Sequence, residues 1–197
     1  DLLSVNRHTA PLRRRCAAKR DTNENRVEDS PMLTREKLTI VQWQAVRNTP
    51  HHVIIAVSSS GGSAFDEMLE RSAGLQGIVD AINSTHPLVS EIAGSTHIMH
   101  AQDDVRKWFY TLDEGHRTPD RLQEKALETA RHALEALGTH GSAEDLMHYG
   151  EFVLSLATRV ARAAREGDLM GIGGELVSEK ERVFIERLDQ LIQERRR

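Results

Sequence analysis

One short stretch decides what this chain can fold into, because it is the only one with the composition of a buried β-strand. Val53–Val57 (VIIAV) is aliphatic and mostly β-branched, and the Ser/Gly segment Ser58–Ser63 follows it. A strand here would place the glycines where nucleotide-binding proteins hold a phosphate at the start of a helix. A strand needs partners for its backbone hydrogen bonds, however, and the chain has no second β-branched run with turn residues. We therefore expect Pro50–Ser59 to be a helix and the glycines to form its exit.

The rest of the chain carries the spacing of helices. From Leu33 onward, apolar residues recur three and four positions apart between residues that typically begin and end helices. In the clearest helix Thr118 is the expected cap, Pro119 lies in the first turn and Gly138 is expected to end it. Its predicted core stripe is Leu122, Ala126, Leu127, Ala130, Ala133, Leu134 and Leu137.

Two further long helices are predicted nearer the C-terminus. One begins after Ser142 and continues to Gly167, and the other begins after Ser178, where Glu181 has the spacing of a capping box. Each carries one apolar stripe at helical spacing, which predicts one buried face. The predicted core residues are Leu146, Tyr149, Val153, Leu156, Val160 and Ala164 in the first helix, and Phe184, Ile185, Leu188, Leu191 and Ile192 in the second.

Shorter helical patterns fill the first half of the chain. They cover Thr39–Asn48, Ser63–Ser84, His86–Met99 and Asp103–Leu112. Together with Pro50–Ser59 and the three long helices, they predict an all-α bundle of about seven or eight helices. The predicted core face of the Ser63–Ser84 helix is Phe65, Met68, Leu69, Leu75, Ile78, Val79 and Ile82.

The composition suits one soluble globular domain. The 197 residues are 39% hydrophobic and 28% charged, and no apolar run approaches the length that crosses a bilayer. We expect a flexible basic N-terminal arm over residues 1–32, which holds seven Lys/Arg and five Asp/Glu, and a single helical domain over residues 33–197. The single cysteine, Cys16, excludes an intramolecular disulfide and suits a cytoplasmic protein. The formal net charge of −4 offers the whole chain no attraction to nucleic acid.

A second glycine segment, GDLMGIGGELVSE, has two features of ligand-binding loops. Its glycines suggest a dinucleotide loop, but they follow a predicted helix rather than a strand and lack the G-x-G-x-x-G spacing. Asp168, Gly173 and Glu179 occupy positions one, six and twelve of a calcium loop. Met170 and Ile172 leave positions three and five of that loop without a side-chain oxygen, so we do not expect calcium there.

The two glycine segments occupy similar places in the pattern of the chain. Each follows a predicted helix and precedes a helix with an acidic first turn, once within Val53–Ile82 and again within Leu156–Ile192. The likeness is one of pattern rather than of identity. It predicts an internal helix-loop-helix pseudo-repeat in which the glycine segments are equivalent corners.

The residues AAREGDLMGIGGELVSEKERVFIERL resemble the C-terminal end of an uncharacterised bacterial all-helical family and, more remotely, TerB-type tellurite-resistance proteins. The shared features are an Ala-rich helix, an acidic glycine corner and a helix that starts with Ser and Glu. The TerB resemblance implies an all-helical fold with an internal repeat, acidic corners that bind divalent metal, and a role in stress resistance or envelope-associated assemblies. It matches Glu166 and Gly167 to an Asp-Gly pair and Glu179 or Glu181 to the acid that follows, with Asp168 between them. The first corner, Ser58–Ser63, has no acid.

Histidines and acids also suggest a metal site away from these corners. HIMHAQDD places His97, His100 and Asp104 at i, i+3 and i+7, which is one face of a continuous helix. Neutral imidazoles and a carboxylate are suitable ligands for zinc or iron. Exposed faces of His and Asp are also common without a metal, so a solvated surface is the alternative interpretation.

A second His-acid pattern occurs in EDLMHYGE. It places Asp145, His148 and Glu151 three positions apart in succession, which is similar to the inward carboxylate-His pattern of di-iron bundles. Those bundles use Glu-x-x-His on two helices, whereas this chain has Asp-x-x-His once. We therefore expect these three residues to form a solvated face.

These patterns favour a function in binding rather than catalysis. We expect a non-enzymatic, stress-associated binding or scaffold module with a protein partner or self-association, and no required cofactor. Three adjacent aromatic residues, Trp108–Tyr110, cannot all enter one core. The expected outcome is burial with one ring incidentally exposed, and the alternative is that this ring serves a partner or dimer surface. The alternative is a divalent-metal-binding helical protein or metalloenzyme. Its ligands would be His97, His100 and Asp104, or the acids between Glu166 and Glu181.

Overall fold

The computed structural model describes residues 33–60, 63–95, 118–166 and 177–197. Over these ranges the backbone is helical and contains no strand, so the all-α fold class is confirmed. Val53–Val57, the only strand-like run, lies inside a helix. The elements are the 3-10 turn η1 (Arg35–Lys37) and the helices α1 (Ile40–Ser58), α2 (Ala64–Ala81), α3 (Pro87–Ser95), α5 (Pro119–His140), α6 (Ala143–Glu166) and α7 (Glu179–Arg195).

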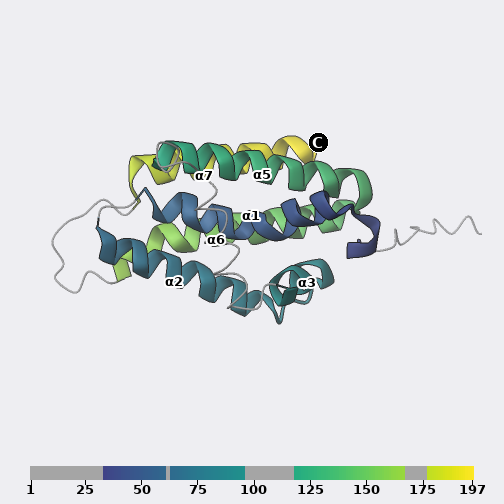
Figure 1. Ribbon diagram of the computed structural model, residues 1–197, viewed down its shortest axis with the longest axis horizontal. Helices are drawn as coiled ribbons and strands as arrows, with labels where there is room; N and C mark the ends of the chain where they lie inside the picture. Colours follow the sequence, from purple (N-terminus) through teal and green to yellow (C-terminus); the bar gives the residue numbers. More distant parts are fainter. Residues whose placement is uncertain (1–32, 61–62, 96–117, 167–176) are drawn as a thin grey trace, which may run out of the picture.

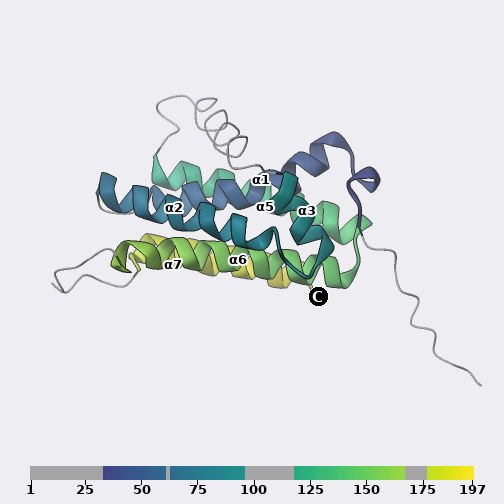
Figure 2. The same ribbon diagram turned by 90° about the horizontal axis from the view of Figure 1, so that it is seen from below.

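The long helices lie side by side along one axis in three tiers (Figures 1 and 2). In Figure 1, α5 and α7 form the upper tier, α1 and α6 the middle one, and α2 with the short α3 the lower one. Helix α1 packs against α5, α6, α2 and α3, and α6 packs against α2 and α7. Ten successive residues of α1, Thr49–Ser58, are buried, so this helix is the centre of the core.

Helix α1 corrects one prediction. Thr39–Asn48 and Pro50–Ser59 were predicted as two helices because proline normally begins a helix or interrupts one. The structure instead has one continuous helix of 19 residues with Pro50 inside it. The described residues therefore hold six α-helices, and the predicted Asp103–Leu112 helix lies outside them. The total of seven or eight helices and the pseudo-repeat stay predictions.

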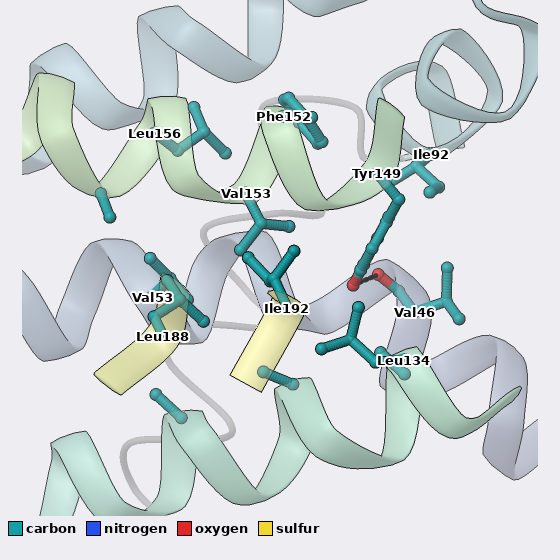
Figure 3. Packing of buried hydrophobic residues seen from close by; sticks show 14 of the residues in the cluster. Val46, Val53, Ile92, Leu134, Tyr149, Phe152, Val153, Leu156, Leu188 and Ile192 are labelled. Atoms are coloured by element: carbon teal, nitrogen blue, oxygen red, sulfur yellow. Dashed lines mark hydrogen bonds between the residues drawn. The ribbon is translucent and has the colours of Figure 1, made fainter. Parts of the chain in front are cut away.

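A tyrosine from another helix compensates for the proline. Pro50 has no N–H to donate to the carbonyl of Val46, four residues earlier, which would leave that buried oxygen without its helical partner. The hydroxyl of Tyr149 on α6 donates to the Val46 oxygen at 2.9 Å (Figure 3). Burial raises the pKa of Tyr149 above its ordinary value, so the hydroxyl keeps its proton. The long-range hydrogen bond thus joins α1 to α6 at the position where α1 lacks a bond of its own.

Capping boxes begin several of the helices. Ser178 and Glu181 form the predicted box at α7, and Ser63 with Asp66 forms one at α2. Ser142 caps α6 as predicted, since its hydroxyl accepts the N–H of Asp145 at 3.0 Å. These reciprocal hydrogen bonds satisfy N–H groups that have no partner within the helix. The helix starts predicted from sequence at these serines are therefore confirmed.

Helix α5 begins where predicted, with Thr118 at the cap position and Pro119 in its first turn, and its buried stripe is confirmed at every position, but its C-terminal end differs. Thr118 stands at the cap position but makes no side-chain cap hydrogen bond. Gly138 does not end the helix, which continues to His140 and is closed by the N–H of Gly141 donating to Leu137 at 2.8 Å. A glycine in an exposed helical turn does not interrupt the helix when the next residues continue its hydrogen bonds.

Helix α2 presents the opposite face to the one predicted. Of the seven apolar residues expected in its core face, only Ile78 is buried. The buried face instead contains Glu70, Gly74 and Gly77. A Cβ added to Gly74 would lie 2.7 Å from a side-chain carbon of Ile54 on α1, and one added to Gly77 would lie 2.6 Å from Leu156 on α6. The two glycines let α2 approach the core so closely that its large apolar residues point elsewhere.

The compensation of Pro50 by the Tyr149 hydroxyl can be tested by a double-mutant cycle. Tyr149→Phe removes the donor to the Val46 oxygen and is expected to lower the free energy of unfolding by about 1–3 kcal/mol. Pro50→Ala supplies a backbone N–H to the same oxygen, so Tyr149→Phe should cost less in that background. Chemical denaturation of the four proteins measures the coupling, and strictly additive effects would contradict the compensation.

The close approach of α2 to the core predicts opposite effects on stability for alanine substitutions at two glycines. Gly74→Ala forces a methyl group against Ile54 and is expected to destabilise the fold by about 1–3 kcal/mol. Gly138→Ala is the matched control, because its Cβ would meet nothing within 4 Å and alanine favours a helix by about 1 kcal/mol. Thermal and urea unfolding should therefore shift in opposite directions for the two variants. If Gly74→Ala left the stability unchanged, α2 would be able to move outward without loss of stability, which would contradict this prediction.

Candidate metal centre

A cluster of His and Glu side chains lies where α2 leads into α3 and α6 begins. His86 immediately precedes α3, and its carbonyl accepts the N–H of Ser90 at 3.0 Å as the first bond of that helix. Glu144 and His148 are four residues apart at the start of α6, so they share one face of the helix. Since α3 packs against α6, the fold brings His86 to this face from a distant part of the sequence.

The three side chains are close enough to bind one ion. One ligand atom from each of His86, Glu144 and His148 lies within 4.8 Å of the other two. The two imidazole rings are 4.5 Å apart between centroids and inclined at 38°. Nε2 of His148 lies 3.7 Å from Oε1 of Glu144. His86 is buried, whereas the side chains of His148 and Glu144 are 35% and 72% exposed, so the cluster opens toward solvent.

Asp145 lies beside His86 on the buried side of the cluster. Its Oδ1 lies 3.6 Å from Nε2 of His86. Its Oδ2 accepts the backbone N–H of Leu33 at 3.1 Å and the N–H of Ser142 at 2.9 Å. A carboxylate beside the second nitrogen of a histidine fixes the orientation of the ring in many metal sites. Asp145 is completely buried, and its Oδ1 lies near the ring of His86 without a hydrogen bond to it.

The electrostatic surroundings keep His86 neutral at neutral pH. Burial lowers the pKa of His86, and the neighbouring His148 lowers it further, while Asp145 and Glu144 act in the opposite direction. A neutral imidazole is the form that binds a metal ion. His86 therefore does not have to lose a proton before it can act as a ligand near pH 7.

A surface hollow of about 330 Å³ adjoins the cluster. His86, His148 and Glu151 line it together with apolar side chains such as Val89 and Phe152. Nδ1 of His148 lies 3.6 Å from Oε2 of Glu151 in this hollow. A small molecule or water can therefore reach the histidines from the solvent side.

The structure describes only some of the predicted ligands. His97, His100 and Asp104 lie outside the described residues, as does Asp168. Glu166 ends α6, but its side chain is likewise outside the description. These metal predictions therefore stay predictions.

The two predicted ligands in α7 do not point to one place. Glu179 is exposed and pairs with Arg182 at 2.6 Å. Glu181 is buried, and its Oε2 accepts the N–H of Ser178 at 2.7 Å in the capping box. The charge of Glu181 contributes to raising the pKa of Glu70 on α2, a residue that the sequence patterns did not single out. The two predicted ligands of α7 are thus engaged in an ion pair and in a helix cap, and they are not gathered into one ligand set.

His148 was singled out from sequence, but with different neighbours. The pattern with Asp145 and Glu151 predicted a solvated face, whereas Asp145 is buried and His148 is half-buried beside Glu144. The available signal was the Glu-x-x-x-His spacing of Glu144 and His148, which places both on one helix face. His86 has no such signal, because only the packing of α3 on α6 brings it near.

Comparisons with protein-family models, with curated proteins and with solved structures give no match for this chain. Within the described residues, no helix has both the length and the apolar content to cross a membrane.

The burial of Glu70 predicts a pH dependence of stability. Burial first, and then the charge of Glu181, raise the pKa of Glu70 from 4.5 to about 8. In the unfolded chain Glu70 ionises near pH 4.5, whereas in the folded protein it stays protonated up to about pH 8. The stability from this group is therefore fully present below pH 4.5 and is lost as the pH rises to about 8.

Glu70→Gln keeps the shape of the side chain and removes its titration. Urea unfolding from pH 4.5 to 8 should show a shallower loss of stability in this variant than in the parent chain. Glu91→Gln on the exposed face of α3 is the control and should leave the pH slope unchanged. Equal slopes for all three proteins would mean that Glu70 titrates as an exposed glutamate does.

Proposed function

We propose that this protein binds a divalent transition-metal ion, with zinc as the best fit, through His86, Glu144 and His148. The single observation that supports this proposal is the approach of their three ligand atoms to within 4.8 Å of one another. The lowered pKa of His86 adds to it, because a neutral imidazole binds metal without losing a proton.

The chemistry of the ligands favours zinc or a neighbouring metal over calcium or magnesium. Two imidazole nitrogens and one carboxylate are a common protein ligand set for zinc, which also accepts water as a fourth ligand. Calcium and magnesium prefer sites made of oxygen atoms alone. Since the hollow beside His86 and His148 is open to solvent, water can complete the coordination shell.

Binding requires a small contraction of the cluster. Ligand atoms about 2.0–2.1 Å from a tetrahedral zinc ion lie roughly 3.4 Å from one another. The ligand atoms of His86, Glu144 and His148 are separated by up to 4.8 Å, so they must move closer together. The exposed side chain of Glu144 and the half-buried side chain of His148 can rotate inward, whereas His86 is buried. The buried histidine is therefore the fixed ligand and the two residues of α6 are the adjustable ones.

The bound ion would join separate parts of the fold. His86 belongs to the segment before α3, and the other two ligands belong to α6. Asp145 links the same place to Leu33, at the start of the described chain. An ion that binds only the folded state stabilises it, so we propose a non-enzymatic helical module whose stability depends on metal. A stress-associated role and the acidic corner between Glu166 and Glu181 remain the alternatives implied by the TerB resemblance.

Metal titration of the full chain tests the proposal. Isothermal titration with Zn²⁺ at pH 7.5 should show one site, and His86→Ala or His148→Ala should lower the affinity by at least 10-fold. Binding should weaken below about pH 6 because protons compete for the imidazoles. His132→Ala, an exposed histidine on α5, is the control and should bind as the parent does.

Two outcomes would contradict this assignment. One is the absence of binding in a fully folded parent chain. The other is binding that survives both histidine substitutions, which would place the ion elsewhere. Loss of binding in Glu181→Gln with normal binding in His86→Ala would favour the acidic corner instead.

A further inference from the structure

Asp145 has one carboxylate oxygen without a hydrogen bond. Its Oδ2 accepts the backbone N–H groups of Leu33 and Ser142 and the hydroxyl of Ser142, at 2.9–3.1 Å. Its Oδ1 is buried and has no hydrogen-bond partner among the residues that the structure describes. A buried oxygen without a partner is unfavourable, and a bound ion is one way in which proteins satisfy such a group.

This oxygen lies beside the ring of His86. Oδ1 of Asp145 is 3.6 Å from Nε2 of His86. An N–H···O hydrogen bond is shorter, at roughly 2.7–3.2 Å. Two ligands of one tetrahedral zinc ion, in contrast, lie about 3.4 Å apart. The two atoms are therefore spaced as ligands of the same ion rather than as a hydrogen-bond donor and acceptor.

Nε2 is also the nitrogen of His86 that an ion can reach. The other ring nitrogen, Nδ1, is buried without a hydrogen-bond partner in the described part of the chain, so an ion cannot approach it from the hollow. Only Nε2 remains as a ligand atom of this histidine. The shortest described carboxylate contact of that nitrogen is the one with Asp145.

A second pair of ligand atoms has a similar spacing. Nε2 of His148 and Oε1 of Glu144 are 3.7 Å apart. On α6, Glu144 and Asp145 lie four and three residues before His148, so both carboxylates are neighbours of that histidine on the helix surface. The cluster thus contains two edges of a tetrahedron, one formed by His86 with Asp145 and the other by Glu144 with His148.

We propose that Oδ1 of Asp145 is the fourth ligand of the metal ion, in the position that water would otherwise occupy. This inference rests on the proposed function, because it concerns the ion bound by His86, Glu144 and His148. Four protein ligands form a closed tetrahedral site, which is typical of structural zinc, whereas a catalytic zinc keeps one position for water. The ion therefore fastens the fold and offers no open position to a substrate.

The charges balance when Asp145 is a ligand. A divalent ion with two neutral imidazoles and two carboxylates has no net charge, which suits a site that is partly removed from water. With Glu144 as the only acidic ligand, the ion would keep one positive charge beside an uncoordinated buried carboxylate. Asp145 and His86 are both buried and form the fixed edge, which the more exposed Glu144 and His148 approach.

Ligand exchange in the cobalt-loaded full chain tests the fourth position without any substitution. Co²⁺ can replace Zn²⁺ in a tetrahedral site, and its visible spectrum changes when an added anion displaces a bound water. An excess of azide should leave the spectrum of the parent chain unchanged, because Asp145 closes the site. In Asp145→Asn the same addition should shift the spectrum, because a neutral amide is a poorer ligand and leaves a position for solvent.

Zinc affinity gives the second measurement. Asp145→Asn should weaken Zn²⁺ binding by at least 10-fold, while its amide oxygen can still accept the N–H of Ser142 and cap α6. Asp66→Asn is the matched control, because Asp66 makes the same capping contacts with Ser63 at the start of α2. This control should bind Zn²⁺ as the parent does. Circular dichroism of the metal-free proteins compares their folds.

The outcomes separate this inference from the proposed function. An azide-dependent spectrum in the parent chain would overturn it, and a weaker affinity of Asp145→Asn would then mean that Asp145 only orients His86. An unchanged Zn²⁺ affinity in a folded Asp145→Asn would overturn it as well. In both cases a loss of binding in His86→Ala and His148→Ala would leave the proposed function intact. A parent chain that binds neither Zn²⁺ nor Co²⁺ would overturn both.

Discussion

The hydrogen bond from Tyr149 to the carbonyl of Val46 is the contact on which the centre of this bundle depends. Pro50 removes a backbone donor from the middle of the most buried helix, and a buried carbonyl without a partner is costly. Tyr149 supplies the missing donor at 2.9 Å from α6. The proline therefore makes α1 depend on α6, and the other helices pack around this joined pair.

The same close packing explains the unusual orientation of α2. Gly74 and Gly77 remove the side chains that would hold α2 away from Ile54 and Leu156. Once the glycine face lies inward, helix geometry places Phe65 and Met68 on the exposed side of α2. A helix can thus point apolar side chains away from its own core when its glycines pack closely against that core.

The candidate metal centre combines a local pattern with a long-range contact. Glu144 and His148 share a helix face because they are four residues apart, which sequence alone can indicate. His86 reaches them only because α3 packs against α6, and the buried carboxylate of Asp145 lies 3.6 Å from its ring. Sequence reasoning identified His148 but grouped it with Asp145 and Glu151, since spacing along one helix says nothing about a ligand from another segment.

The sequence by itself determined the helical fold class, most helix starts and the buried stripes of α5, α6 and α7. Apolar spacing and capping residues act over one or two turns, so they are visible in a short window. Only the tertiary structure decided that α1 continues through Pro50, that α2 turns its glycines inward and that His86 joins His148. Each of these outcomes depends on atoms contributed by a distant helix: a hydroxyl, a close-packed side chain or a second ligand.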